Sequence, residues 1–234
     1  MTPDRAGPAH QGAVLFDIDG TLVDSNYLHV HAWTRAFLDG GHPVDAAQVH
    51  RGMGMGSELL LPELLGEDVA QESGADLKER HSAVYAELAP LLRVFDGAQE
   101  LVREVGRRGA RTVLATSASA GELERLRAVL GLDDVVDGVA SAKDVEDAKP
   151  APDLSESALE LAGVPAERAV MVGDAVWDVI AAQRAGVACV GVLTGGTSEA
   201  ELLEAGAVAV YRDVATLLAE LDASPLAATW ADAG

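Results

Sequence analysis

The alternation of short apolar runs with helical patterns over residues 98–221 constrains the fold more than any other feature of the sequence. The apolar runs predict strands at 112–115, 135–139, 169–172, 187–193 and 208–211, after a first strand at 13–16. Helical patterns, most of them closed by a glycine, separate these strands. Strands that alternate with helices predict an α/β fold with a doubly wound parallel sheet.

A helical block interrupts this alternation after the first strand. Residues 26–93 contain several helical patterns and no convincing strand. We therefore expect two domains, a core formed by residues 12–25 and 94–222 and an inserted helical cap at 26–93. The terminal segments 1–11 and 223–234 are rich in small and polar residues, and we expect them to be flexible.

Two aspartates follow the first strand directly. Asp17 and Asp19 are separated by one residue, so in an extended chain their side chains point the same way. The carboxyl edge of an open parallel sheet is where ligands bind, and two adjacent carboxylates repel each other unless a cation or a proton compensates them. The simpler interpretation is a strand that ends in a polar turn at Asp19 and Gly20.

Other polar residues are expected at the same edge of the sheet. Ser117 and Asp174 each follow a predicted strand, and Lys149 lies in a proline-bracketed loop before a helix. The oxygen atoms of Asp17, Asp174 and Asp178 suit Mg²⁺, and no cluster of Cys and His indicates zinc. Ser117 and Lys149 offer a hydroxyl group and a cation that suit a phosphate. An anion held between Mg²⁺ and a lysine is the arrangement that phosphoryl transfer needs.

The charge of the chain limits its partners. Asp and Glu number 38 against 17 Lys and Arg, which gives a net charge of −21. Such a surface repels nucleic acid and anionic membranes, and no run approaches the ~18 apolar residues of a membrane helix. The single cysteine, Cys189, excludes an intrachain disulfide, so we expect a cytoplasmic protein. We also expect it to be a monomer or a weak dimer.

Four motifs in order resemble those of the haloacid dehalogenase superfamily, in its phosphatase branch with a helical cap of the C1 type. They are DIDGT at 17–21, ATSAS around Ser117, AKPAPD around Lys149 and GDAVWD at 173–178. The resemblance covers about residues 13–221. It implies a Rossmann-like catalytic core and the activity of a phosphoric monoester hydrolase.

The resemblance implies a chemical role for four of these residues. Asp17 would attack the phosphorus atom and form an aspartyl-phosphate. Asp19 would protonate the leaving oxygen and then deprotonate the hydrolytic water. Ser117 and Lys149 would bind the transferring phosphoryl group.

The resemblance also implies how a metal would be held. Asp17, the main-chain carbonyl of Asp19 and Asp174 would bind Mg²⁺, and Asp178 would support the site without contacting the ion. One departure from the family is Ala148, where glycine is usual before the lysine. The alanine restricts the backbone mildly and removes no catalytic group.

The cap would select the substrate, and His29, Arg51 and Met55 are the candidate residues. His29 and the loop at Arg51 resemble β-phosphoglucomutases, but those mutases carry glutamate at the place of Gly173 and a phosphate-binding arginine at that of Met55. We therefore expect Mg²⁺-dependent hydrolysis of a small phosphorylated metabolite, such as a sugar phosphate. A β-phosphoglucomutase-like mutase and a phosphoglycolate phosphatase are the alternatives, and a non-catalytic binding protein on this fold is a minor one.

Overall fold

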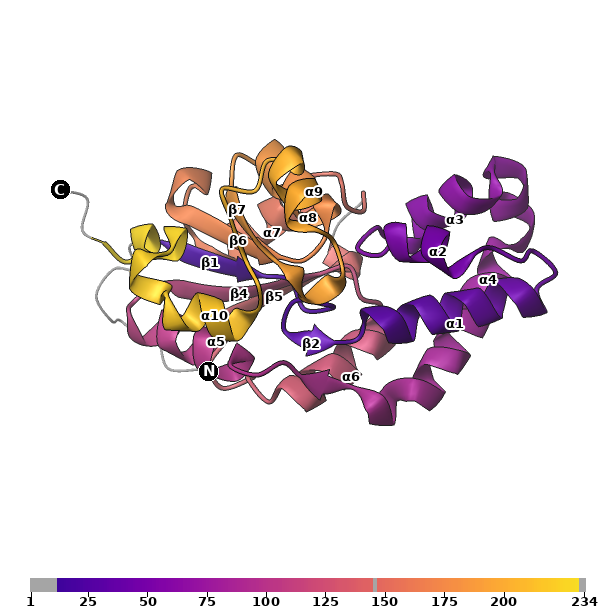
Figure 1. Cartoon of the computed structure of the whole chain (residues 1–234), viewed down its shortest axis with the longest axis horizontal. Coiled ribbons are helices and arrows are strands. Elements are labelled where there is room, and N and C mark those ends of the chain that lie inside the picture. Colours follow the sequence, from indigo (N-terminus) through magenta and orange to yellow (C-terminus); the bar gives the residue numbers. More distant parts are fainter. Residues whose placement is uncertain (1–11, 145–146, 232–234) are drawn as a thin grey trace.

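The computed structural model describes residues 12–144 and 147–231, which form an α/β core and an adjoining helical unit (Figure 1). The core is built on a six-stranded sheet in which all neighbouring strands are parallel. In the order β5-β4-β1-β6-β7-β8, the strands are Gly138–Ser141, Arg111–Thr116, Ala13–Phe16, Ala169–Gly173, Ala188–Val192 and Ala209–Tyr211. The predicted doubly wound parallel sheet is confirmed.

Helices bury both faces of this sheet, because successive residues of a strand point to opposite faces. Val14 and Phe16 of β1 belong to one apolar cluster, and Ala13 and Leu15 belong to another on the opposite face. Side chains of α5 (Ala98–Arg107), α6 (Ala120–Leu130) and α10 (Val214–Ala219) join the first cluster. Side chains of α7 (Asp153–Ala162), α8 (Val176–Arg184) and α9 (Glu199–Ala205) join the second. Burial on both faces explains why the strands read as continuous apolar runs.

The helical unit lies beyond the carboxyl edge of the sheet (Figure 1). It consists of α1 (Asn26–Asp39), α2 (Ala46–Arg51), α3 (Ser57–Leu65) and α4 (Glu67–Leu88). These helices enclose an apolar cluster of their own, around Trp33, Phe37 and Leu77. The two connections to the core run side by side, since β2 (Val23–Asp24) pairs with β3 (Arg93–Val94) in an antiparallel ribbon. No helix among the described residues is long and apolar enough to cross a membrane.

Two elements begin elsewhere than the sequence predicts. The strand predicted at 135–139 is β5, and it starts only at Gly138 because the amides of Val135 and Val136 bond back to the Leu132 carbonyl in a turn. The helical pattern of the sequence predicts a helix from Asp76 to Leu92, but helix α4 starts at Glu67, nine residues earlier.

The C-terminal segment differs from expectation as well. Residues Leu221–Ala223 and Pro225–Thr229 form short 3₁₀ turns, and the side chains of Leu226 and Thr229 are buried. Leu226 joins the core cluster on the face of α5 and α10, and the Arg108 guanidinium lies 5.3 Å from the centre of the Trp230 ring. The prediction of a flexible tail from residue 223 is therefore wrong for residues 223–231, while 1–11 and 232–234 lie outside the described residues.

Candidate active site

A pocket of about 420 Å³ opens between the carboxyl edge of the sheet and the helical unit. The core lines it with residues that follow β1 and β4, including Asp17, Asp19 and Ser117, and with Lys149. The helical unit contributes the opposite wall, with apolar, hydroxyl and charged side chains. The lining residues of the helical unit include His29, Trp33, Met53, Met55, Ser57, Glu58, Leu60, Lys78, His81 and Ser82.

Lys149 joins two carboxylates at the base of the pocket. Its ammonium nitrogen lies 2.6 Å from Asp17 Oδ1 and 2.6 Å from Asp178 Oδ1, and all three side chains are buried. Burial disfavours the charged lysine, but the charges of Asp17 and Asp178 outweigh it and raise the pKa of Lys149 above its usual value. Lys149 is therefore an ammonium ion at neutral pH. Asp178 also accepts a hydrogen bond from the Ala175 amide at 3.1 Å.

Asp174 stands next to this group, at the end of β6. Its Oδ1 accepts a hydrogen bond from Thr21 Oγ1 at 2.8 Å, and its Oδ2 accepts one from Asn26 Nδ2 at 2.8 Å. Two glycines leave room for it, because a Cβ at Gly195 would overlap Asp174 Oδ2 and one at Gly20 would overlap Asn26 Nδ2. Burial, followed by repulsion from Asp178, raises the pKa of Asp174 to about 7.

The buried aspartates fit a hard divalent cation. Carboxylate oxygens of Asp17, Asp174 and Asp178 all lie within 4.8 Å of one another. Only oxygen donors are present, which suits Mg²⁺ or Ca²⁺ better than a softer metal. Burial raises the pKa of Asp17 well above its usual value, and the nearby aspartates add to this against the opposing charge of Lys149. A cation would relieve that repulsion.

Asp19 lines the pocket together with Asp17, two residues earlier in the chain. Its Oδ1 accepts a hydrogen bond from Ser25 Oγ at 2.6 Å and lies 3.4 Å from His29 Nε2. Burial would raise the pKa of Asp19, but His29 and Ser25 outweigh it and hold the pKa below its usual value. The Asp19 carboxylate is thus held toward the pocket, and only its main-chain carbonyl remains as a candidate metal ligand.

Ser117 and its neighbour Thr116 both line the pocket. The Thr116 hydroxyl accepts a hydrogen bond from the Ala118 amide at 3.0 Å and lies 3.5 Å from Asp19 Oδ2. Ser117 is only partly buried, which leaves its hydroxyl facing the pocket as the better candidate for contact with a ligand.

The three residues proposed for substrate selection separate in the structure. His29 and Met55 line the pocket, whereas Arg51 is exposed and its Nε donates to the Ala47 carbonyl at 3.3 Å. The structure therefore does not bring Arg51 into the pocket. A cation does enter from the helical unit, since Lys78 of α4 lines the pocket and pairs with Glu58 at 2.5 Å.

The helical unit rests directly on the core. Trp177 Nε1 donates to the Arg51 carbonyl at 3.2 Å, and His50 Nε2 lies 2.9 Å from the Gly195 carbonyl. The loop between α2 and α3 approaches so closely that a Cβ at Gly56 would overlap the Ala148 methyl group. The unit thus covers Asp17 and Lys149, which limits the access of water.

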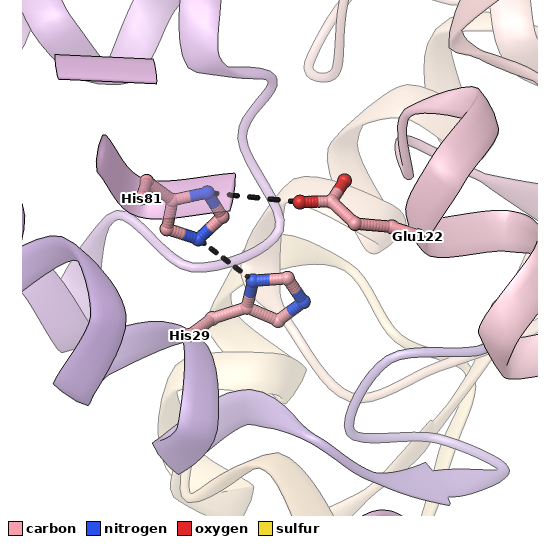
Figure 2. Close-up of side chains that lie close together, drawn as sticks. All are labelled: His29, His81 and Glu122. Atoms are coloured by element: carbon pink, nitrogen blue, oxygen red, sulfur yellow. Dashed lines mark hydrogen bonds and ion pairs between the residues drawn. The ribbon is translucent and has the colours of Figure 1, made fainter. Parts of the chain in front are cut away.

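Two further pocket residues, His81 of α4 and Glu122 of α6, are absent from the sequence-based prediction. His81 Nε2 lies 3.1 Å from His29 Nδ1, and His81 Nδ1 lies 3.6 Å from Glu122 Oε1 (Figure 2). In the sequence, each is one polar residue on an otherwise ordinary amphipathic helix. The only signal was a histidine at a position that the helical pattern buries.

Comparisons with known proteins point to one family. A family model described as haloacid dehalogenase-like hydrolase matches residues 12–186. Phosphoglycolate phosphatase of Rhodospirillum rubrum is 33% identical, over 88% of this chain and 88% of the relative. A phosphorylated carbohydrates phosphatase of Thermotoga maritima is 32% identical, over 86% of this chain and 94% of the relative. The crystal structure of a hydrolase from Pseudomonas syringae is similar with a TM-score of 0.87 and 34% identity, covering 91% of this chain and 99% of that chain.

Proposed function

The chain belongs to the haloacid dehalogenase-like hydrolases, and we propose that it is a Mg²⁺-dependent phosphatase that hydrolyses a small phosphorylated metabolite through an aspartyl-phosphate. One observation carries the proposal. Asp17 lies in the pocket with Lys149 Nζ at 2.6 Å from its Oδ1, and Asp17 Oδ2 accepts no hydrogen bond from the described residues. A buried carboxylate with one oxygen held and one free is poised to act as a nucleophile.

In the first half-reaction, the free oxygen of Asp17 attacks the phosphorus atom, and the bond from phosphorus to the leaving oxygen breaks. Lys149 and the Ser117 hydroxyl bind the equatorial phosphoryl oxygens, where charge must be neutralised. Asp19, once it has taken up a proton from solvent, delivers that proton to the leaving oxygen. The products of this step are the alcohol and the aspartyl-phosphate at Asp17, which is an acyl phosphate.

In the second half-reaction, water attacks the same phosphorus atom. Asp19, now deprotonated, takes a proton from the water, and the bond from phosphorus to Asp17 breaks to release inorganic phosphate. The hydrogen bond from Ser25 and the contact with His29 keep the Asp19 carboxylate in place for both proton transfers.

Asp17, the Asp19 carbonyl and Asp174 would hold the Mg²⁺ ion, and Asp178 would fix Lys149 and the metal ligands in place. When bound, Mg²⁺ supplies charge neutralisation for the approaching phosphate dianion. This is important for a chain with a net charge of −21, whose surface repels anions at long range.

The pocket favours a sugar phosphate or a metabolite of similar size over phosphoglycolate. A volume of about 420 Å³ is in the range that holds a drug-sized ligand, and a two-carbon acid would fill little of it. Trp33 and Met55 offer apolar surface, while Ser57 and Ser82 offer hydroxyl groups that could bond to a sugar.

Hydrolysis is favoured over phosphoryl transfer between two sites of a sugar. A mutase must grip a second phosphate, and Met55 offers no charge to a dianion. Lys78 is the cation of the helical unit that lines the pocket, and Glu58 neutralises it at 2.5 Å. Gly173 also fits the hydrolase, because a Cβ there would lie 2.5 Å from Asp178 Cβ.

The first test is phosphate release from p-nitrophenyl phosphate with and without Mg²⁺, with Asp17→Asn as the control. We expect release only with the metal, and less than a few per cent of it in the variant, which removes the nucleophile at nearly constant volume. A panel of phosphorylated metabolites then identifies the substrate. Glucose 6-phosphate that accumulates from β-glucose 1-phosphate and a trace of bisphosphate, with little free phosphate, would identify a mutase instead.

A further inference from the structure

Four polar side chains form a continuous chain that runs from the reacting end of the pocket to the core helix α6. Asp19 Oδ1 lies 3.4 Å from His29 Nε2. His29 in turn faces His81 and His81 faces Glu122, with atom separations of 3.1 and 3.6 Å (Figure 2). The two histidines come from the helical unit and the two carboxylates come from the core. Each histidine of the unit therefore contacts one carboxylate of the core.

The charge of Glu122 determines where His81 carries its proton. A carboxylate only accepts hydrogen bonds, so the nitrogen that faces it, Nδ1 of His81, is favoured as the protonated one. Burial and the charge of His29 lower the pKa of His81 to about 2, so His81 is neutral and has a single ring proton. Its Nε2 is then an acceptor.

The position of the proton on His81 in turn determines which nitrogen of His29 donates to it. Because Nε2 of His81 accepts, Nδ1 of His29 at 3.1 Å must donate to it. The remaining nitrogen of His29, Nε2, is the one that faces Asp19. Glu122 therefore favours a hydrogen bond from His29 Nδ1 to His81, which leaves His29 Nε2 facing Asp19, although Glu122 does not itself contact Asp19.

Aromatic stacking holds both imidazole rings against rotation. His81 stacks on Trp33 with ring centres 4.1 Å apart, and His29 stacks on Tyr85 at 3.9 Å. The ring planes in these pairs differ by 17° and 13°. With the rings fixed, the position of the proton, and not the orientation of the ring, is what the partners can change.

The same three residues, His29, His81 and Glu122, also bring possible metal ligand atoms within 4.8 Å of one another. Each nitrogen of His81, however, already faces a different partner, one toward Glu122 and one toward His29. A shared metal would have to break one of these contacts. The hydrogen-bonded chain from Glu122 through His81 to His29, in contrast, keeps both contacts of His81.

We propose that His81 and Glu122 are positioning residues that keep Nδ1 of His29 bonded to His81 and its Nε2 turned to Asp19, and so hold the Asp19 carboxyl group in place for proton transfer to the leaving group. The inference rests on the proposed phosphatase function. Because the chain of contacts crosses from the helical unit to the core, it is complete only when the unit lies on the core as it does here.

The first test does not need activity. In protein labelled with nitrogen-15 at histidine, we expect the ring signals of His81 to show a protonated Nδ1 and an unprotonated Nε2. Glu122→Gln keeps the size of the side chain and an oxygen to accept from the Ser119 amide, a bond of 2.8 Å in the wild type, but removes the charge. We expect that variant to shift His81 toward the other tautomer. A wild-type His81 protonated on Nε2 would overturn the proposal, whatever the enzyme does.

The second test separates positioning from a general loss of structure. Proton delivery is important for an alkyl phosphate, whose leaving oxygen is basic, and much less for p-nitrophenyl phosphate. For Glu122→Gln we expect kcat/KM to fall at least about tenfold with the alkyl substrate, part of the ~10²–10⁴-fold of general acid catalysis. With p-nitrophenyl phosphate we expect a change below about twofold.

Glu124→Gln is the matched control, because Glu124 lies on the same helix and is exposed. It should leave both substrates unaffected. An equal loss with both substrates in Glu122→Gln would mean structural damage and would contradict the positioning role. A wild type without any phosphatase activity would contradict the proposed function instead, and the tautomer measurement would still decide the inference.

Discussion

The ammonium group of Lys149 lies 2.6 Å from Asp17 Oδ1, and both side chains are buried at the carboxyl edge of the sheet. A buried charge pair gains little net stability, but loss of one partner leaves the other charge uncompensated. Here the cost is increased because Lys149 also faces Asp178, which is buried as well.

Lys149→Met should therefore abolish activity and destabilise the metal-free protein by about 3–5 kcal/mol. Chemical denaturation with EDTA present measures the change in the free energy of unfolding. Lys143→Met is the matched control, since Lys143 is exposed and should change stability by less than about 0.5 kcal/mol. An equal, small effect of both variants would show that Lys149 compensates no buried charge.

The stability of the metal-free protein should depend on pH because ionisation of the buried Asp174 side chain is unfavourable. Its pKa is raised to about 7 in the folded protein, so the folded state binds the proton more tightly than the unfolded state does. The stabilisation from this proton is present at low pH and is lost as the pH rises toward 7. Asp174→Asn removes this titration, so in EDTA the Tm of the variant minus that of the wild type should increase from pH 5 to pH 8.

Mg²⁺ should reverse this trend in the wild type, because the ion competes with protons for the same carboxylates. The increase in Tm upon addition of Mg²⁺ should be larger at pH 8 than at pH 5 and absent in Asp174→Asn. A Tm response to Mg²⁺ that is independent of pH would argue against a metal site at these aspartates.

The tight space at Gly195 yields a fourth prediction. A Cβ there would overlap Asp174 Oδ2, so Gly195→Ala must displace the carboxylate or the loop. We expect it to lose most activity and the Tm response to Mg²⁺. Gly106→Ala serves as the control, since it lies within α5 with its nearest neighbour 3.9 Å away, and alanine there should stabilise the helix by about 0.5–1 kcal/mol.

The strands and the core half of the site could be predicted because both are local in the sequence. A parallel sheet buried on both faces has continuous apolar strands, and the polar residues just beyond each strand end, such as Asp17 and Asp174, must meet at one edge. What local pattern cannot reveal is close packing between elements. Gly74 is an example, since it lies inside α4, where a Cβ would approach Leu61 to 3.3 Å.

The half of the site in the helical unit was predicted less well for the same reason. Arg51 follows His50 in sequence, but its side chain turns back to the Ala47 carbonyl. Lys78 and His81 enter the pocket because α4 packs on α1, a tertiary contact without any sequence signature. Their helical spacing alone predicts only that they share a face.

The last prediction concerns Gly56 and Ala148, which meet where the helical unit touches the core. A Cβ at position 56 would overlap the Ala148 methyl group. The backbone conformation of Gly56 itself allows alanine, so this overlap is the only obstacle to the substitution. Gly56→Ala should push the loop away from Lys149 and reduce kcat/KM by about tenfold to a hundredfold, as small misplacements in active sites do.

Ala148→Gly removes the methyl group and should by itself leave activity near that of the wild type. In the double variant, Gly56→Ala with Ala148→Gly, the space is restored, and kcat/KM should return to within about threefold of Ala148→Gly. Such non-additivity is the expected sign of two residues in direct contact. If the double variant is as slow as Gly56→Ala alone, the overlap does not cause the loss, and the helical unit closes on the core in some other way.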